Sequence, residues 1–106
     1  MNTSELTGAA LDWAVAKCEG KFFAEAGEKF KPAYSPSTNW AQGGPLIERE
    51  KISTNSDYNG AHTDPWVAET YSGGTQLAGP TPLIAAMRCY VASKLGETVD
   101  IPEELL

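Results

Sequence analysis

The sequence predicts a small α+β protein in which an N-terminal and a C-terminal helix pack against one small antiparallel sheet. Residues 6–19 and 83–95 carry apolar side chains at helical spacing, and each stretch ends at a glycine. Residues 46–54 and 66–71 have the composition of short strands. A chain of 106 residues has the length of one domain, so we expect a single domain over 1–106.

The N-terminal helix is expected to begin after Thr3, Ser4 or Thr7 and to end before Gly20. Its apolar residues occupy more than one face, and a chain this short gains much from shared burial. We therefore predict a homo-oligomer, most simply a two-fold dimer. The two apolar rows are Leu11, Val15 and Cys18, and Leu6, Ala10 and Trp13.

The central stretch, residues 34–50 (YSPSTNWAQGGPLIERE), is expected to be an irregular loop that enters a strand at residue 46. Tyr34 and Trp40 offer ring surfaces, and Gly43 and Gly44 allow a close approach to the backbone. Such a loop is typical of a segment that contacts a planar or polar ligand. In an arbitrary small domain, however, such a stretch is more often a well-packed structural loop.

The two predicted strands are separated by loop-forming residues, too many for a tight hairpin and too few for a crossover helix. If they pair, they are antiparallel. In the C-terminal helix, Thr81 suits the N-cap, Pro82 the first helical position and Gly96 the C-terminal end.

Charge and composition exclude several classes of protein. The 14 acidic and 8 basic side chains give a net charge of −6, which argues against binding to nucleic acids and to anionic membranes. No apolar run is long enough for a membrane span, and we expect a cytoplasmic protein. Cys18 and Cys89 lie in helical patterns and are expected to be buried free thiols.

No catalytic or metal-binding signature is present, so we expect neither enzymatic activity nor a cofactor. His62 is the only histidine, and no further ligand is spaced to complete a metal site with it. Hydrolysis through Glu48 or Asp64 is the weakest of the functional hypotheses.

Four blocks of the chain resemble the NinX-like family of small phage proteins: SELTGAALDWAVAKCEG, YSPSTNWAQGGPLIERE, the Trp66-x-Ala68 strand and GPTPLIAAMRCYVASKLG. The resemblance runs over nearly the whole chain. It implies an accessory gene of a phage or prophage, expressed in the cytoplasm of the bacterial host. It supplies no catalytic residues, because the family has no established activity.

Two functions fit these observations. The leading hypothesis is a non-enzymatic protein that sequesters a small anionic or nucleotide-like host molecule, in a counter-defence role. Aromatic rings would stack on the base, while glycine amides, hydroxyls and arginines would hold phosphate or ribose oxygens. The candidate ligand-binding residues are Tyr34, Ser35, Ser37, Trp40, Gly43, Gly44, Arg49, Trp66, Thr81 and Arg88.

The alternative is an inhibitor or adaptor that binds a host protein through the same aromatic loop, since Trp, Tyr and Arg are the usual interface hot spots. The two hypotheses differ in the expected geometry. A ligand pocket turns the aromatic rings inward around a concavity, whereas an interface displays them on a flat or convex surface.

Overall fold

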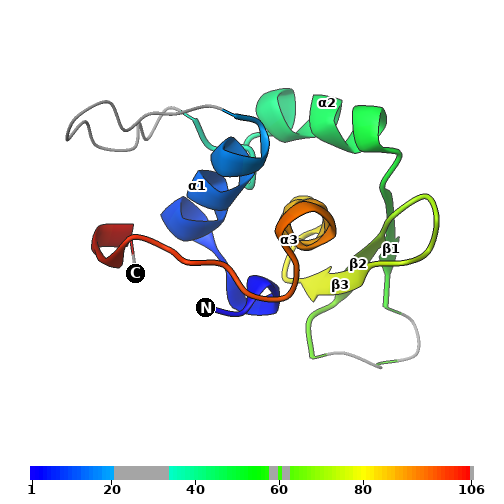
Figure 1. Ribbon diagram of the computed structural model, residues 1–106. Coiled ribbons are helices and arrows are strands. Elements are labelled where there is room, and N and C mark those ends of the chain that lie inside the picture. The colour runs from blue at the N-terminus through cyan, green and yellow to red at the C-terminus, as the bar shows by residue number, and fades with distance from the viewer. Residues whose placement is uncertain (21–33, 58–59, 61–62, 106) are drawn as a thin grey trace.

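The computed structural model describes residues 1–20, 34–57, 60 and 63–105. Within these residues the fold is α+β, as predicted, with a three-stranded antiparallel sheet and three α-helices (Figure 1). The expectations for His62 concern a residue outside this part of the chain. The elements are η1 (Thr3–Glu5), α1 (Gly8–Cys18), α2 (Trp40–Glu50), β1 (Ser53–Ser56), β2 (Trp66–Glu69), β3 (Gln76–Gly79), α3 (Pro82–Leu95) and η2 (Glu103–Leu105).

Helix α3 is the centre of the molecule. In Figure 1 it is seen nearly end-on, with α1, α2 and the sheet arranged around it. The predicted signals at both ends are confirmed: the Thr81 side chain accepts a hydrogen bond from the Ile84 amide at 3.1 Å, and Gly96 ends the helix with a φ of 89°. Because other elements surround it, α3 is buried on almost every side. Its buried residues are Leu83, Ala85, Ala86, Met87, Arg88, Cys89, Tyr90 and Val91.

The strand order is β1-β2-β3, and both pairings are antiparallel. The strand expected over 66–71 is confirmed in its first four residues as β2, whereas β3 was not predicted. The turn from β3 into α3 is tight, since a Cβ on Gly79 would lie 2.6 Å from the Ala85 amide nitrogen. One face of the sheet packs on α3, which places β3 and β2 closest to that helix.

Helix α1 is shorter than the expected 6–19 but occupies the same place in the chain. Its two apolar rows are covered within this one chain: Leu6, Ala10, Leu11 and Val15 are buried in the core, and Trp13 packs against it. The apolar faces of α1 therefore do not require a second chain to cover them, and self-association stays a prediction.

The strand expected over residues 46–54 is wrong for most of its length. Residues 46–50 form the second half of α2, and β1 begins only at Ser53. The irregular loop expected through residue 45 is wrong from residue 40 onward for the same reason. Local sequence disfavours this helix, so its cause lies in its contacts with the rest of the protein.

Candidate functional site

Helix α2 has clear ends despite its unfavourable middle. The Asn39 side chain caps its start by accepting a hydrogen bond from the Ala41 amide at 3.0 Å. Lys51 ends it in the left-handed conformation (φ 55°), and the Ile52 amide bonds back to the Ile47 carbonyl at 3.0 Å. These bonds satisfy groups that a helix end otherwise leaves unpaired.

Gly43 fixes how closely α2 approaches its neighbours. A Cβ at this position would lie 2.3 Å from the Pro36 carbonyl oxygen and 2.7 Å from a Leu83 methyl carbon. The Gly43 amide donates to the Asn39 carbonyl at 2.9 Å. The absence of a side chain at Gly43 thus serves helix packing, and its amide has a partner within the protein.

The side of α2 that faces solvent, which we call the α2 outer face, consists of Trp40, Ala41, Gly44, Pro45 and Glu48. Trp40 is 54% exposed and lies over Gly44, where a Cβ would be 4.0 Å from the indole ring. Pro45 has no amide hydrogen, so the Ala41 carbonyl lacks its helical partner. The α2 outer face therefore joins an exposed indole to small residues and to a carbonyl that has no i+4 amide donor.

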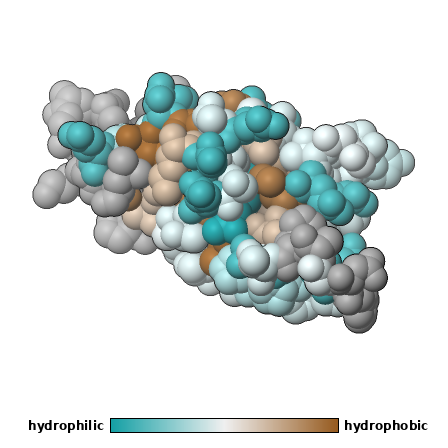
Figure 2. Space-filling model, turned by 90° about the horizontal axis from the view of Figure 1, so that it is seen from below, coloured by the Kyte–Doolittle hydropathy of each residue, from teal (hydrophilic) through white to brown (hydrophobic). Residues whose placement is uncertain are grey.

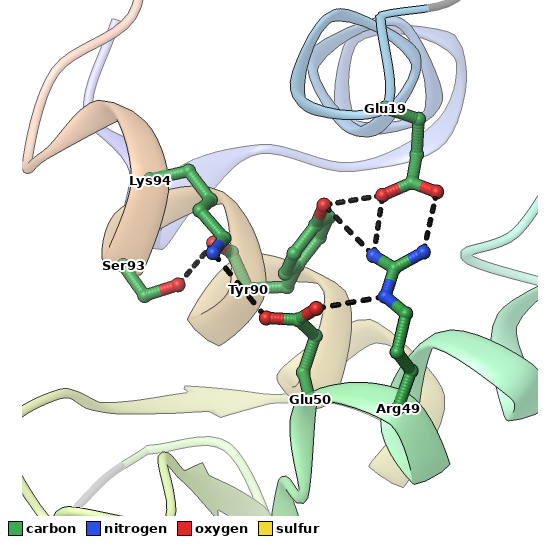
Figure 3. Close-up of polar contacts among 6 residues, drawn as sticks. All are labelled: Glu19, Arg49, Glu50, Tyr90, Ser93 and Lys94. Carbon is green, nitrogen blue, oxygen red and sulfur yellow. Dashed lines mark hydrogen bonds and ion pairs between the residues drawn. The ribbon is translucent and has the colours of Figure 1, made fainter.

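Charged residues at the C-terminal ends of all three helices meet in one network, which we call the helix-end cluster (Figure 3). Arg49 of α2 binds Glu19 through two hydrogen bonds of 2.9 and 2.6 Å, and its Nε donates to Glu50 at 2.8 Å. Lys94 of α3 lies 3.4 Å from the other Glu50 oxygen. Tyr90 donates its hydroxyl hydrogen to Glu19 and accepts from Arg49 at 3.2 Å.

The helix-end cluster neutralises itself, since two carboxylates face two cations. The hydrogen bonds that Arg49 donates to Glu19 and Glu50 raise the pKa of Arg49 further above its usual value, and the same bond from Arg49 lowers the pKa of Glu50. Burial and then Glu19 raise the pKa of Tyr90, so its hydroxyl remains a donor. This arrangement fixes the end of α2 to α1 and α3, and it leaves Arg49 with little free charge for a phosphate.

A second tether holds the segment before α2. The Ser37 amide donates to Asp12 of α1 at 2.8 Å, and the Ser35 amide donates to Gln42 of α2 at 2.6 Å. Asp12 is 5% exposed, and this burial raises the pKa of its carboxyl group. The buried Ser37 hydroxyl has no hydrogen-bond partner among the described residues. Ser35 and Ser37 thus place the start of α2 against α1.

The structure brings Ser35, Ser37, Trp40, Gly43, Gly44 and Arg49 together on or beside α2. Tyr34 precedes this segment, packs against the core and has its pKa raised to about 12, mainly by burial. Trp66 packs against the core from β2, and Thr81 caps α3. Of the three candidate aromatic residues, only Trp40 is turned to solvent.

The Arg88 side chain is buried and holds parts of the fold together. It is 5% exposed and donates to the Leu6 carbonyl at 2.8 Å and to the Ala78 carbonyl at 2.9 Å. It also binds Asp64 at 3.2 Å. Arg88 therefore joins the N-terminal segment to β3 and to the loop before β2.

A pocket of about 430 Å³ lies elsewhere, between η1, the start of β3 and the end of α3. None of the ten candidate residues lines it. Figure 2 views the molecule from the side on which η1 lies in Figure 1, and there hydrophilic and near-neutral residues cover most of the described surface. Glu97 is the one ionisable side chain among the lining residues, which are Asn2, Thr3, Ser4, Gly74, Thr75, Gln76, Leu77, Ala92, Gly96 and Glu97.

The described residues offer no group of three or more His, Cys, Asp or Glu side chains that could hold a metal ion. Cys18 and Cys89 are free, and burial raises the pKa of both thiols to about 11. None of the helices in the described part of the chain has the length and apolar composition of a membrane span.

The helix-end cluster was not predicted, because Glu19, Arg49 and Tyr90 are far apart in the sequence. The available signal was weak: each of the three helices ends in charged residues, and two of those helices were expected to pack on the same small sheet. Seeing that the ends meet required knowing that residues 40–50 are helical.

The comparison with curated proteins gives no match. A family model described as Bacteriophage P22, NinX matches residues 2–94, a span that contains α1, α2, all three strands and all of α3 except its last residue. This match confirms the resemblance seen in the sequence, and the chain belongs to the NinX family of phage proteins.

Proposed function

We propose that this phage protein is a non-enzymatic adaptor or inhibitor that binds a protein of the bacterial host through the α2 outer face. The observation that carries the proposal is the position of Trp40, which is 54% exposed. It lies on α2, and hydrogen bonds to Asp12 and Glu19 attach both ends of this helix to α1. An indole this exposed contributes little to the stability of the isolated protein, but tryptophan is among the residues that contribute most to protein interfaces.

The surroundings of Trp40 support binding to a protein. Gly44 and Ala41 beside it are small, so a partner can approach the helix backbone closely. The pattern fits recognition of a helix by a groove, in which the indole fills an apolar pocket and Glu48 meets a cation at the rim. The net charge of −6 favours a partner with a basic surface around that groove.

The test is site-specific photo-crosslinking in infected host cells, with a benzophenone side chain at position 40. Tyr71 is the matched control, because it is 80% exposed and lies outside the α2 outer face. We expect position 40 to crosslink one host protein that position 71 does not. Equal products from both positions, or none from position 40, would contradict the proposal.

Sequestration of a nucleotide-like host molecule, in a counter-defence role, is the second candidate. The 430 Å³ pocket supports it, since ligand sites typically span about 300–1,000 Å³. The described residues of its lining include no Lys or Arg, so it suits an uncharged polar ligand such as a nucleoside better than a phosphate. Calorimetric titration with nucleosides and nucleotides tests this second candidate. If neither class of compound gives a heat of binding, the candidate is ruled out.

A further inference from the structure

The two edges of the sheet differ in how their backbone groups are satisfied. In an antiparallel ladder, alternate residues of an edge strand direct their N–H and C=O groups inward and outward. The Asp57 amide bonds to the Pro65 carbonyl at 2.8 Å, which extends the β1–β2 ladder by one inward-bonding position. Residues 53 and 55 therefore bond to β2, and Thr54 and Ser56 direct their backbone groups outward.

The β3 edge is covered. The same alternation directs the backbone groups of Gln76 and Ala78 outward, since the Thr70 amide bonds to Thr75 across the β2–β3 turn. The Ala78 carbonyl accepts a hydrogen bond from Arg88, and η1 packs against β3. This edge is therefore partly satisfied and shielded from another chain.

The β1 edge is open in the described part of the chain. β1 is the outermost strand, and no described element lies beyond it (Figure 1). Although it is only four residues long, it carries no charged residue, proline or bulge, which are three of the features that prevent edge strands from pairing. Two N–H and two C=O groups, at Thr54 and Ser56, are thus available to an extended strand.

We propose that β1 pairs with β1 of a second copy of this chain, antiparallel about a two-fold axis at Asn55. This register places Thr54 opposite Ser56 of the partner subunit, and Ser56 opposite Thr54 of the partner subunit. The outward N–H and C=O groups of the two strands then form four hydrogen bonds. The edge is thus complementary to itself, as a two-fold interface requires. The product is one continuous six-stranded sheet.

The side chains favour the second copy as the occupant. Strand β1 is uncharged, so pairing places no like charges opposite each other although each chain carries −6. Asn55 is exposed on the face of the sheet away from α3. At the axis its amide would meet the same amide of the partner subunit, and the two can exchange a hydrogen bond. This surface is separate from the α2 outer face, so the proposal does not depend on the proposed function.

The first test is amide hydrogen exchange measured over a range of protein concentrations. The Thr54 and Ser56 amides should become protected as concentration rises toward about 1 mM, a range suited to a small interface. The Asn55 amide bonds to β2 and should be protected at every concentration. Rapid exchange of Thr54 and Ser56 at all concentrations would overturn the proposal.

The second test is Asn55→Lys, followed by sedimentation equilibrium. This change makes the net charge less negative, so general repulsion predicts tighter association. Pairing at Asn55 predicts the opposite, because two lysines would face each other at the axis, and the dissociation constant should rise about tenfold or more. Gln76→Lys makes the same charge change on the exposed edge residue of β3 and should leave the constant unchanged. Equal effects of the two substitutions, or a monomer at every concentration, would overturn the proposal.

Discussion

Helices α2 and α3 begin alike and yet depend on opposite sources of stability. Each starts at a residue whose side chain caps the first turn, Asn39 or Thr81. In α3 the proline is at the first position, where its missing amide costs nothing, whereas α2 carries Gly43, Gly44 and Pro45 in its middle. Two interior glycines cost about 1 kcal/mol each relative to Ala and an interior proline about 3 kcal/mol. Contacts with the rest of the protein must offset these costs in α2.

The difference teaches where function can reside. Helix α3 is buried at the centre of the core, so its buried side chains serve packing. Helix α2 is anchored on its inner side by Gly43 and Leu46 and at its C-terminal end by the helix-end cluster, which leaves its outer side free.

The largest effect is expected at Arg88 of α3. Arg88→Met removes the donors to the Leu6 and Ala78 carbonyls, and a buried polar group that loses its partner typically costs about 1–3 kcal/mol. The Asp64 side chain is 37% exposed, so the loss of its ion pair with Arg88 adds little. Arg49→Met removes a half-exposed arginine from α2 and should cost about 1 kcal/mol or less. Urea denaturation measures the free energy of unfolding of both variants. Equal losses of stability would contradict the different structural roles of the two arginines.

The next comparison lies within α2. Gly43→Ala should destabilise the protein by about 1–3 kcal/mol, although alanine favours helices, because its Cβ would overlap Pro36 and Leu83. Gly44→Ala meets only the Trp40 ring at 4.0 Å and should stabilise the protein by about 1 kcal/mol. If tertiary contacts determine whether α2 forms, thermal unfolding will show a lower melting temperature for Gly43→Ala and a higher one for Gly44→Ala. The same sign for both would show that propensity dominates.

The contrast explains how much of the fold the sequence could predict. Residues 83–95 were predicted correctly because the cap, the proline, the apolar pattern and the closing glycine all agree. The prediction for residues 40–50 was wrong because the Gly-Gly-Pro sequence indicates a loop locally. Only the packing of this segment against Pro36 and Leu83 overrides that signal. Strand β3 was missed because its four residues, Gln76–Gly79, are too few to show a period.

The candidate site was predictable to a lesser degree. Trp40 was identified because an aromatic residue beside glycines and proline is conspicuous in the sequence. The burial of Arg88 and the partners of Arg49 could not be predicted, because they depend on Leu6, Ala78 and Glu19, which lie far away in the chain.

A smaller effect is expected at the helix-end cluster. Tyr90→Phe keeps the ring but removes the hydroxyl that binds Glu19 and Arg49, and hydrogen bonds to charged groups contribute about 1.5–3 kcal/mol. We expect a loss near the lower limit, because Arg49 still binds Glu19. Amide exchange should rise more in α2 than in α3. A uniform increase across both helices would contradict an anchoring role for this hydroxyl.

Asp12→Asn tests the tether before α2, and its effect depends on pH. Burial raises the folded-state pKa of Asp12 above its ordinary value of 3.8, so folding disfavours the charged form. The stability that wild-type Asp12 contributes at low pH is therefore lost as pH rises through its folded pKa. Asparagine can still accept from Ser37, and the variant should be more stable than wild type at pH 7 but not below the unfolded-state pKa. A stability difference that does not change with pH would contradict this account.

The most direct test of the central claim compares folding and binding in the variant Trp40→Ala. Because Trp40 is exposed, its loss should change the free energy of unfolding by no more than about 0.5 kcal/mol. Affinity for the host protein crosslinked at position 40 should fall by about 2 kcal/mol or more, as at an interface hot spot. Calorimetric titration and urea denaturation of the same preparation give both numbers. Unchanged affinity, or a loss of stability as large as the loss of affinity, would contradict the claim that α2 presents Trp40 to a partner.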